Sequence, residues 1–398
     1  MQTRFQSLDA ILQQSQHYWR FEPFHESRNG LTRFGSNQAL TAWLSSLELS
    51  QVEELKQNSS LLTDALARFI QVTEALSSLS ELKDTEYRAQ RLDSHQASGI
   101  PGRKLTQIEA MGSAAMSHHQ GQRWLEWCAG KGFLGRMLAV GTKQPVTSFE
   151  WQQMLCDKGQ AESDKLELPV EFVNGDAFCC EKHQLFSNDL HAVALHACGD
   201  LHVVLMKQAS QHQIKNLSIA PCCYHLIRDD SYQAMSEYGK ASELSLSKNE
   251  LRIPLQETVT GGERVSRHRH QEMVYRLALD ELLRDQTGKD EYQSIPSVKK
   301  SQLQFGFEAF CRWASDKKGF ELLEADWAEY ESRGEARFLD MERLGLVQQL
   351  FQRPLELWLV LDKALYLQEQ GYQVELSQFC DKKITPRNIL IQAALDEN

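Results

Sequence analysis

The chain has 398 residues, of which 41% are hydrophobic and 24% are charged, values typical of globular proteins. Disordered and fibrous classes are therefore excluded, and the length predicts two or three domains or one domain with insertions. The formal net charge of −11 gives no overall field that would attract nucleic acid, so any contact with RNA requires a local basic patch.

Cysteine usage and the apolar runs indicate the compartment. No apolar run approaches the roughly 18 residues of a membrane span, and the first residues lack the apolar core of a signal peptide. The nine cysteines include adjacent pairs at 179–180 and 222–223 but no CxxC pair. We therefore expect a soluble cytoplasmic protein with reduced thiols and no contact with membranes.

The first part of the chain, residues 1–95, predicts a helical domain. Apolar residues recur near helical spacing from Leu62 to Leu76, and Ser50 with Glu53 matches a capping box. A polar stretch from His95 to Lys104 marks the end of this domain. We expect it to pack or to position a substrate.

Residues 96–228 alternate short apolar runs with helical stretches. The runs predicted as buried strands are Arg123–Cys128, Pro145–Glu150, Val170–Asn174, His191–His196 and Asn216–Ala220. A mostly helical insertion follows over residues 229–370, and strands at Tyr372–Leu376 and Ile389–Leu395 close the chain over residues 371–398. This alternation predicts an α/β fold with a Rossmann-like sheet of seven strands, whose last two form a hairpin.

A glycine loop follows the first predicted strand, where Gly130, Gly132 and Gly135 match G-x-G-x-x-G. Glycines there let the backbone approach a nucleotide, and the next helix favours negative charge. Glu126 precedes the loop, and its charge would repel the pyrophosphate of NAD but suit the cationic S-adenosylmethionine (SAM). The loop with Cys128 and Ala129 therefore favours SAM.

Two more acids follow the next strands. Glu150 can accept hydrogen bonds from both ribose hydroxyls, which fits NAD as well as SAM. Asp176 can accept from the adenine amino group, while the backbone N–H of Ala177 meets the ring. Acids at three successive strand ends favour a SAM pocket over a dehydrogenase site, and we expect His196, after the fourth strand, to complete it.

Two further motifs follow the fourth and fifth strands, ALHACGDLH (Ala194–His202) and APCCYH (Ala220–His225). Together with the glycine loop, they resemble a group of class I SAM-dependent methyltransferases. The group contains the methyltransferase-like 25 proteins and the eukaryotic acceptor-stem tRNA 2′-O-methyltransferase. The likeness covers about residues 100–228 and the last strand, which Pro386-Arg387-Asn388 precedes. It implies methyl transfer from SAM, with RNA (tRNA or rRNA) as the leading substrate.

The candidate catalytic residues are His196, Asp200, Cys223 and His225, because an open α/β sheet places its site at the carboxyl ends of its strands. A histidine or aspartate would serve as base for a hydroxyl nucleophile, whereas a nitrogen nucleophile needs mainly positioning. Adjacent cysteines such as Cys222 and Cys223 are not expected to point into one tetrahedral site, so we predict no metal.

The most basic short run, RVSRHRH (Arg264–His270), follows Gly261 and Gly262 and opens a predicted helix. It is either a solvated helix face or a phosphate-binding patch formed by Arg264, Arg267 and Arg269. An RNA methyltransferase is therefore the main hypothesis. The alternatives are a protein or small-molecule methyltransferase and a non-catalytic scaffold that binds SAM or RNA.

Overall fold

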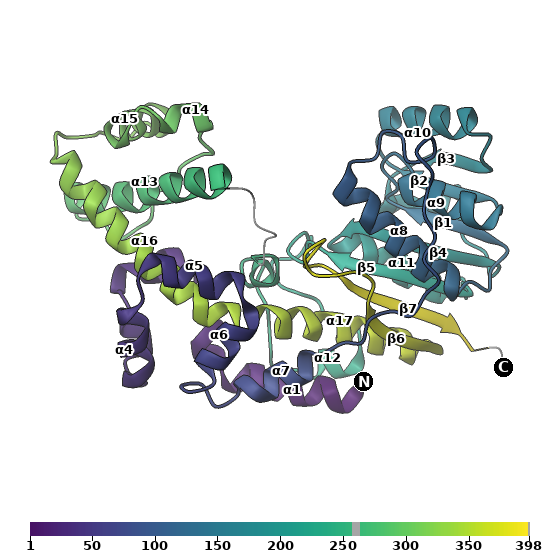
Figure 1. Cartoon of the computed structure of the whole chain (residues 1–398), viewed down its shortest axis with the longest axis horizontal. Helices are drawn as coiled ribbons and strands as arrows, with labels where there is room; N and C mark the ends of the chain where they lie inside the picture. The colour runs from purple at the N-terminus through teal and green to yellow at the C-terminus, as the bar shows by residue number, and fades with distance from the viewer. Residues whose placement is uncertain (257–262, 397–398) are drawn as a thin grey trace. The chain divides into compact units, whose positions relative to one another are not determined.

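The computed structural model describes residues 1–256 and 263–396. They form two compact units, each built from segments that are far apart in the sequence (Figure 1). Of the described residues, unit 1 contains 1–14, 76–256 and 352–396, and unit 2 contains 15–75 and 263–351. The sequence predicts four consecutive segments, whereas the structure combines parts of the N-terminal segment and of the insertion in unit 2.

A shared apolar core explains this grouping. Leu40 and Leu62 from the N-terminal segment belong to the same buried cluster as Leu344 and Val347 from the insertion. Helical periodicity shows that a helix has a buried face, but not which helix covers it.

Unit 1 holds the sheet. Its strands are β1 (Arg123–Trp127), β2 (Val146–Glu150), β3 (Val170–Asn174), β4 (Leu190–Cys198), β5 (Asn216–Cys222), β6 (Tyr372–Gln378) and β7 (Ile389–Leu395). Its helices are α1 (Gln2–Gln14), α8 (Gly102–Ser117), α9 (Phe133–Thr142), α10 (Gln153–Lys165), α11 (Asp200–Gln211), α12 (Glu237–Lys240) and α17 (Gln352–Glu369), with 3-10 segments η3 (Ala177–His183) and η4 (Glu250–Leu255).

The regular secondary structure in the described residues of unit 2 is all helical. It contains α2 (Gln16–Trp19), α3 (Pro23–Glu26), η1 (Ser27–Asn29), η2 (Thr32–Phe34), α4 (Gln38–Ser46), α5 (Leu49–Gln57), α6 (Ser59–Leu66), α13 (Glu263–Thr287), α14 (Lys300–Leu303), α15 (Phe307–Lys318) and α16 (Trp327–Gln349), while α7 (Thr73–Ser80) leads into unit 1. The expected capping box is displaced by two residues. The backbone N–H of Glu48, before α5, donates to Gln51 Oε1 at 2.9 Å, and Ser50 lies inside the helix.

The sheet has the order β3-β2-β1-β4-β5-β7-β6 (Figure 1). Strands β1 to β5 are parallel, and β7 is antiparallel to both β5 and β6. This confirms the predicted α/β fold, the seven strands and the final hairpin. The central β5 is buried along its whole length, as expected for a strand covered on both faces.

This strand order places the site. The chain runs outward from β1 to β3 on one side and restarts at β4 on the other, so the carboxyl ends of β1 and β4 flank the point where the order reverses. Open α/β sheets bind ligands at that point. Within the described residues, no helix has both the length and the apolar character that crossing a bilayer requires.

Candidate active site

The glycine loop joins β1 to α9 through three residues with left-handed backbone. Cys128, Gly130 and Gly132 have φ values of 56°, 61° and 68°. A Cβ on Gly132 would lie 2.4 Å from the Phe172 ring, so a glycine is required there for space as well as for conformation. A Cβ on Gly130 would meet nothing within 4 Å. The loop therefore leaves its Gly130 side open.

Glu126 lies beneath this loop and not on its open side. Its carboxylate accepts hydrogen bonds from the Leu134 N–H at 3.2 Å and from the Ser148 hydroxyl at 2.7 Å. The side chain is buried, and this burial raises its pKa to about 7. The structure thus gives Glu126 the role of anchoring the N-terminus of α9, whereas the sequence predicts a direct cofactor contact.

Glu150, at the end of β2, holds the glycine loop in place through a hydrogen bond to its backbone. Its Oε2 accepts the Gly130 N–H at 2.9 Å, and its Oε1 accepts the Gln152 N–H at 3.0 Å. The Asn174 side-chain amide also donates to the backbone oxygens of Glu150 and Trp151. Each carboxylate oxygen keeps a lone pair, so Glu150 is held ready to accept hydroxyl groups of a ligand.

Asp176 follows β3 and begins η3. Its Oδ1 accepts the Phe178 N–H at 2.9 Å, while the Asp176 side chain is exposed and Ala177 is buried. The Arg228 guanidinium lies 3.6 Å from the centre of the Phe178 ring. This contact links the turn after β3 to the turn after β5. Sequence reasoning missed Arg228, because a cation that stacks on a distant ring leaves no local motif.

Across the pocket, His196 sits near the end of β4 with a left-handed φ of 71°. Its Nε2 lies 3.1 Å from Gln107 Oε1 on α8, and the Gln107 amide nitrogen donates to Ile384 O at 3.3 Å. Burial, followed by the nearby Lys104, lowers the pKa of His196, so the ring is neutral at pH 7. Gln107 is a second residue that sequence reasoning missed.

Asp200 begins α11 and holds a turn. Its Oδ2 accepts the Arg228 N–H at 2.7 Å, and its own N–H donates to Leu226 O at 3.1 Å. A Cβ on the preceding Gly199 would lie 1.8 Å from Leu226 O, so only glycine fits. Through these contacts, Asp200 holds the turn after β4 against the turn after β5. The sequence predicts Asp200 as a candidate catalytic base.

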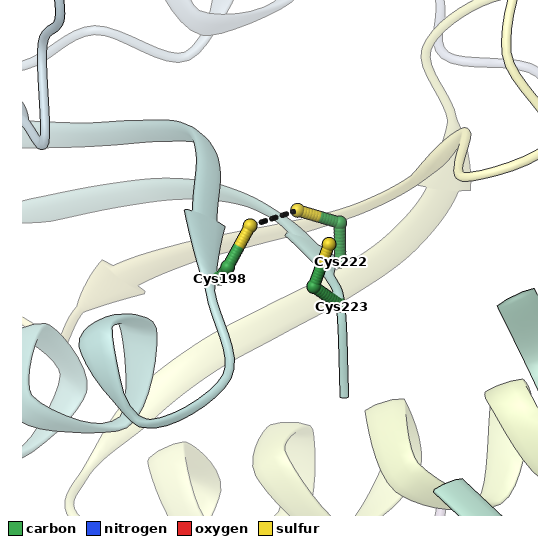
Figure 2. Close-up of side chains that lie close together, drawn as sticks. All are labelled: Cys198, Cys222 and Cys223. Carbon is green, nitrogen blue, oxygen red and sulfur yellow. Dashed lines mark hydrogen bonds between the residues drawn. The ribbon is translucent and has the colours of Figure 1, made fainter. Parts of the chain in front are cut away.

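The cysteines converge, contrary to the expectation for an adjacent pair. The sulfurs of Cys198, Cys222 and Cys223 all lie within 4.8 Å of one another, and Figure 2 shows them turned toward a common point. Cys198 and Cys222 are 3.4 Å apart at Sγ. The convergence arises because Cys223 has a left-handed φ of 46°, which turns its side chain back toward Cys222. The thiols of Cys198 and Cys222 hold the pKa of Cys223 well below its usual range.

His225 follows this cluster by two residues and is half-buried. Its Nδ1 is buried and has no hydrogen-bond partner among the residues that the structure describes. Burial, followed by the nearby Arg252, lowers the pKa of His225. The four predicted catalytic residues therefore come from the ends of β4 and β5, as the sequence implies.

A cationic cavity adjoins the glycine loop on the side of α9 and α10. It has a volume of about 280 Å³, and its lining includes Lys131, Arg136, Lys158 and Glu162. The buried Arg136 guanidinium donates to the backbone oxygens of Gln96 and Ser98, which hold it in place. The cavity thus offers an excess of positive charge in a protein of negative net charge.

The predicted basic run lies on α13 in unit 2. Arg264, Arg267 and Arg269 are all exposed, and Arg269 also donates to Glu342 at 3.2 Å. Gly261 and Gly262, the glycines that precede the run, lie outside the described residues. All three arginines are therefore presented to solvent by this helix, although one of them is also ion-paired.

The chemistry of the pocket fits SAM. The acids at the ends of β2 and β3 are acceptors for hydroxyl and amino groups, which SAM carries and to which Glu150 is already oriented. The glycine loop supplies backbone groups on its open side. Residues that would hold SAM are therefore Cys128, Ala129, Gly130 and Gly132 in the loop, with Glu150, Asp176, Ala177 and His196 around it.

Comparisons with known proteins give one family match and several distant structural similarities. Residues 103–230 match the family model described as a methyltransferase domain. Among solved structures, the Pyrococcus abyssi tRNA (uracil-54, C5)-methyltransferase is 16% identical over 34% of this chain and 35% of that one, with a TM-score of 0.27.

The geranyl diphosphate C-methyltransferase of Streptomyces coelicolor A3(2) is 14% identical over 35% of this chain and 57% of its own, with a TM-score of 0.25. A SAM-dependent methyltransferase from Aquifex aeolicus is 17% identical over 37% and 70%, with a TM-score of 0.22. The chain spans between 35% and 48% of the length of the first structures that it matches. On the family match, residues 103–230 form a methyltransferase domain, and the order of the sheet and its acidic strand ends fit SAM as the cofactor.

Proposed function

We propose that the protein transfers the methyl group of SAM to a hydroxyl group of RNA. When bound, SAM supplies an activated methyl group on a sulfonium. The protein has to hold the acceptor in line with that group and to remove the proton of the hydroxyl. The likeness of the strand-end motifs to the methyltransferase-like 25 proteins and to the acceptor-stem tRNA enzyme supports RNA as the acceptor.

The observation that carries the proposal is the hydrogen-bond chain from Ile384 O through Gln107 to His196. Because the Gln107 amide nitrogen donates to Ile384 O, its Oε1 faces His196 and requires a proton on His196 Nε2. The neutral ring then has its lone pair on Nδ1. His196 is thereby fixed in the tautomer of a general base, with Nδ1 as the accepting atom.

The cationic cavity supports a phosphate-bearing acceptor. Lys131 lies in the glycine loop itself, and Lys158 and Arg136 line the same cavity, so a phosphate held there would lie next to the cofactor loop. Phosphate contacts of this kind set the position of RNA on a protein without reading its sequence. Neither a neutral metabolite nor a protein acceptor would need this concentration of charge.

Labelled SAM provides the test. Purified protein is incubated with methyl-labelled SAM and with RNA, protein or metabolite fractions from a strain that lacks the gene. We expect label in RNA, on a ribose or base hydroxyl that nucleoside mass spectrometry identifies. Label confined to the protein or metabolite fraction would contradict the RNA substrate, and SAM binding without label in any fraction would favour a non-catalytic scaffold.

Variants of His196 and Gln107 test the base. His196→Ala should lower turnover about a hundredfold, the usual contribution of a positioned base, while SAM affinity changes little. His212→Ala is the matched control, because His212 follows α11 at its opposite end from Asp200. Gln107→Leu should lower turnover without changing KM, and Gln107→Glu, which keeps an acceptor, should restore it. If His196→Ala retains full turnover, the acceptor is not deprotonated by this histidine.

A further inference from the structure

The three-cysteine cluster has the dimensions of a metal site. A tetrahedral zinc ion with Zn–S bonds of about 2.3 Å places its sulfurs about 3.8 Å apart. The Cys198 and Cys222 sulfurs are 3.4 Å apart, and all three sulfurs lie within 4.8 Å of one another. Shifts of about 1 Å or less would therefore bring the three sulfurs to ligand positions around one ion.

The backbone is strained on both sides of the cluster. Cys223 has a φ of 46°, and His196, two residues before Cys198, has a φ of 71°. The pairing of β4 with β5 is also irregular between Leu195 and Cys198. Left-handed backbone costs a residue with a side chain about 1–2 kcal/mol, and such strain collects at sites where it serves a function. Here the strain is what directs the three sulfurs to one point.

Two imidazole nitrogens near the cluster have no hydrogen-bond partner among the described residues. His202 donates from Nδ1 to Ala197 O at 3.0 Å, so its buried Nε2 carries an unused lone pair. The buried Nδ1 of His225 is likewise unused. Unsatisfied buried groups call for an explanation such as a bound ion or water.

We propose that Cys198, Cys222 and Cys223 bind one zinc ion through their thiolates and leave its fourth position for an exchangeable ligand. Thiolates are the ligands that zinc prefers among soft donors, and three protein ligands with an open position are typical of a catalytic and not a structural zinc site. Cys198 and Cys223 are only half-buried, so an ion held here remains accessible. The proposal rests on the sulfurs alone and holds whichever acceptor the enzyme methylates.

The metal content of the reduced protein tests this proposal. Protein is purified without metal-affinity resin under anaerobic, reducing conditions, loaded with zinc and dialysed against a weak chelator. We expect one equivalent of zinc by elemental analysis. Loading with cobalt instead should give sulfur-to-cobalt charge-transfer absorption and the intense visible bands of a tetrahedral ion.

Single serine variants locate the site. Cys198→Ser, Cys222→Ser and Cys223→Ser should each lower zinc affinity at least tenfold and remove one sulfur's share of the charge-transfer absorption. Cys179→Ser is the matched control, because Cys179 is exposed and lies outside the cluster. SAM binding by calorimetry shows that each variant is folded, and it separates this test from the one of methyl transfer.

Three results would overturn the proposal. One is reduced parent protein that retains neither zinc nor cobalt. Another is zinc retention that none of the three cluster variants weakens. The third is a Cys198–Cys222 disulfide that forms in air even after the protein has been loaded with zinc, because it would mean that the sulfurs are placed for oxidation and not for a metal.

Discussion

The cofactor side of the pocket, at the ends of β1 and β2, differs from the side at the ends of β4 and β5. The difference lies in how many buried polar groups have hydrogen-bond partners within the protein. On the cofactor side, the carboxylates of Glu126 and Glu150 each accept two hydrogen bonds from the chain, mostly from backbone N–H groups. On the side of β4 and β5, buried nitrogens of His202 and His225 lack partners among the described residues. Two non-glycine residues, His196 and Cys223, have left-handed backbone there, against one, Cys128, on the cofactor side.

This difference indicates which side is complete without a ligand. A carboxylate that is already oriented by the backbone loses little entropy when a ligand binds, so the cofactor side is preorganised. The β4–β5 side carries strain and unused lone pairs, whose cost is recovered only when something binds there. The predictions below test the comparison between the two sides.

The largest effect on stability is expected at Gly199, in the turn after β4, where there is no space for a side chain. Gly199→Ala combines a left-handed φ of 56° with a Cβ 1.8 Å from Leu226 O, whereas Gly130→Ala has a similar φ of 61° and open space. We expect Gly199→Ala to lower the free energy of unfolding by about 2–5 kcal/mol and Gly130→Ala by about 1–2 kcal/mol. Denaturant unfolding without SAM measures both. Equal effects would mean that the β4–β5 turns move apart easily.

Glu126 gives the cofactor side a pH dependence. Its pKa of about 7 in the folded protein, raised by burial from 4.5, means that the folded state holds this proton more tightly. Stability due to this group therefore falls as the pH rises from 4.5 to 7. Glu126→Gln has no titrating group at this position, so it does not lose this stability. Between pH 5 and pH 8 the free energy of unfolding of the parent should therefore fall by about 2–3 kcal/mol relative to that of the variant.

The exposed Glu171 on β3 supplies the control for that experiment. Glu171→Gln should leave the pH dependence of unfolding as in the parent. A constant difference between Glu126→Gln and the parent over this pH range would show that Glu126 is ionised throughout and that the buried anchor of α9 is charged.

Glu150 tests the preorganised carboxylate directly. Glu150→Gln removes its charge while keeping its volume, and the loss of a charged hydrogen bond should cost about 1.5–3 kcal/mol, or roughly a ten- to hundredfold loss in SAM affinity. Asp176→Ala should weaken SAM binding in the same direction. Calorimetry with SAM and with its demethylated product measures both. If both variants bind SAM like the parent, the adenosine part of SAM lies elsewhere.

The smallest effect concerns the acceptor. Each lost phosphate contact lowers the salt dependence of RNA binding by about one unit of slope. Arg264→Ala with Arg267→Ala should flatten the slope by up to about two units and leave SAM affinity unchanged. Arg269→Ala should do less, because Glu342 already pairs with Arg269. Arg312→Ala is the control, since Arg312 is also exposed on unit 2 but pairs with Glu308. An unchanged slope in the double variant would make the run a solvated helix face.

The sequence predicts the strands and the strand-end residues well, because both are local. The apolar runs of β1 to β5 and the residues that follow them can be located without knowing their neighbours. Contacts between residues that are far apart in the sequence cannot be predicted in this way. Gln107 contacts His196 across 89 positions, and nothing in α8 marks it as a pocket residue. The same limit explains why the sequence predicts the helices of unit 2 as parts of two separate segments.

Two details of the site depend on backbone geometry, which the sequence does not show. Glu126 points into the protein and not toward the loop, which depends on the path of α9 and not on the acid-to-glycine spacing. Cys223 adopts a left-handed φ, which cannot be predicted from its residue type. This single angle brings two adjacent sulfurs to the same point. A sequence pattern gives the order of side chains but not such a turn.

The position of β7 has a consequence for biosynthesis. β7 (Ile389–Leu395) lies between β5 and β6, so both strands keep an unpaired edge until the ribosome has added residue 395. An unpaired edge invites pairing with other chains, and β5 is apolar along its length. The nascent chain therefore carries an open sheet edge from the synthesis of β5 until that of β7. Protection by chaperones should matter most during the interval in which β5 has left the ribosome and β7 has not.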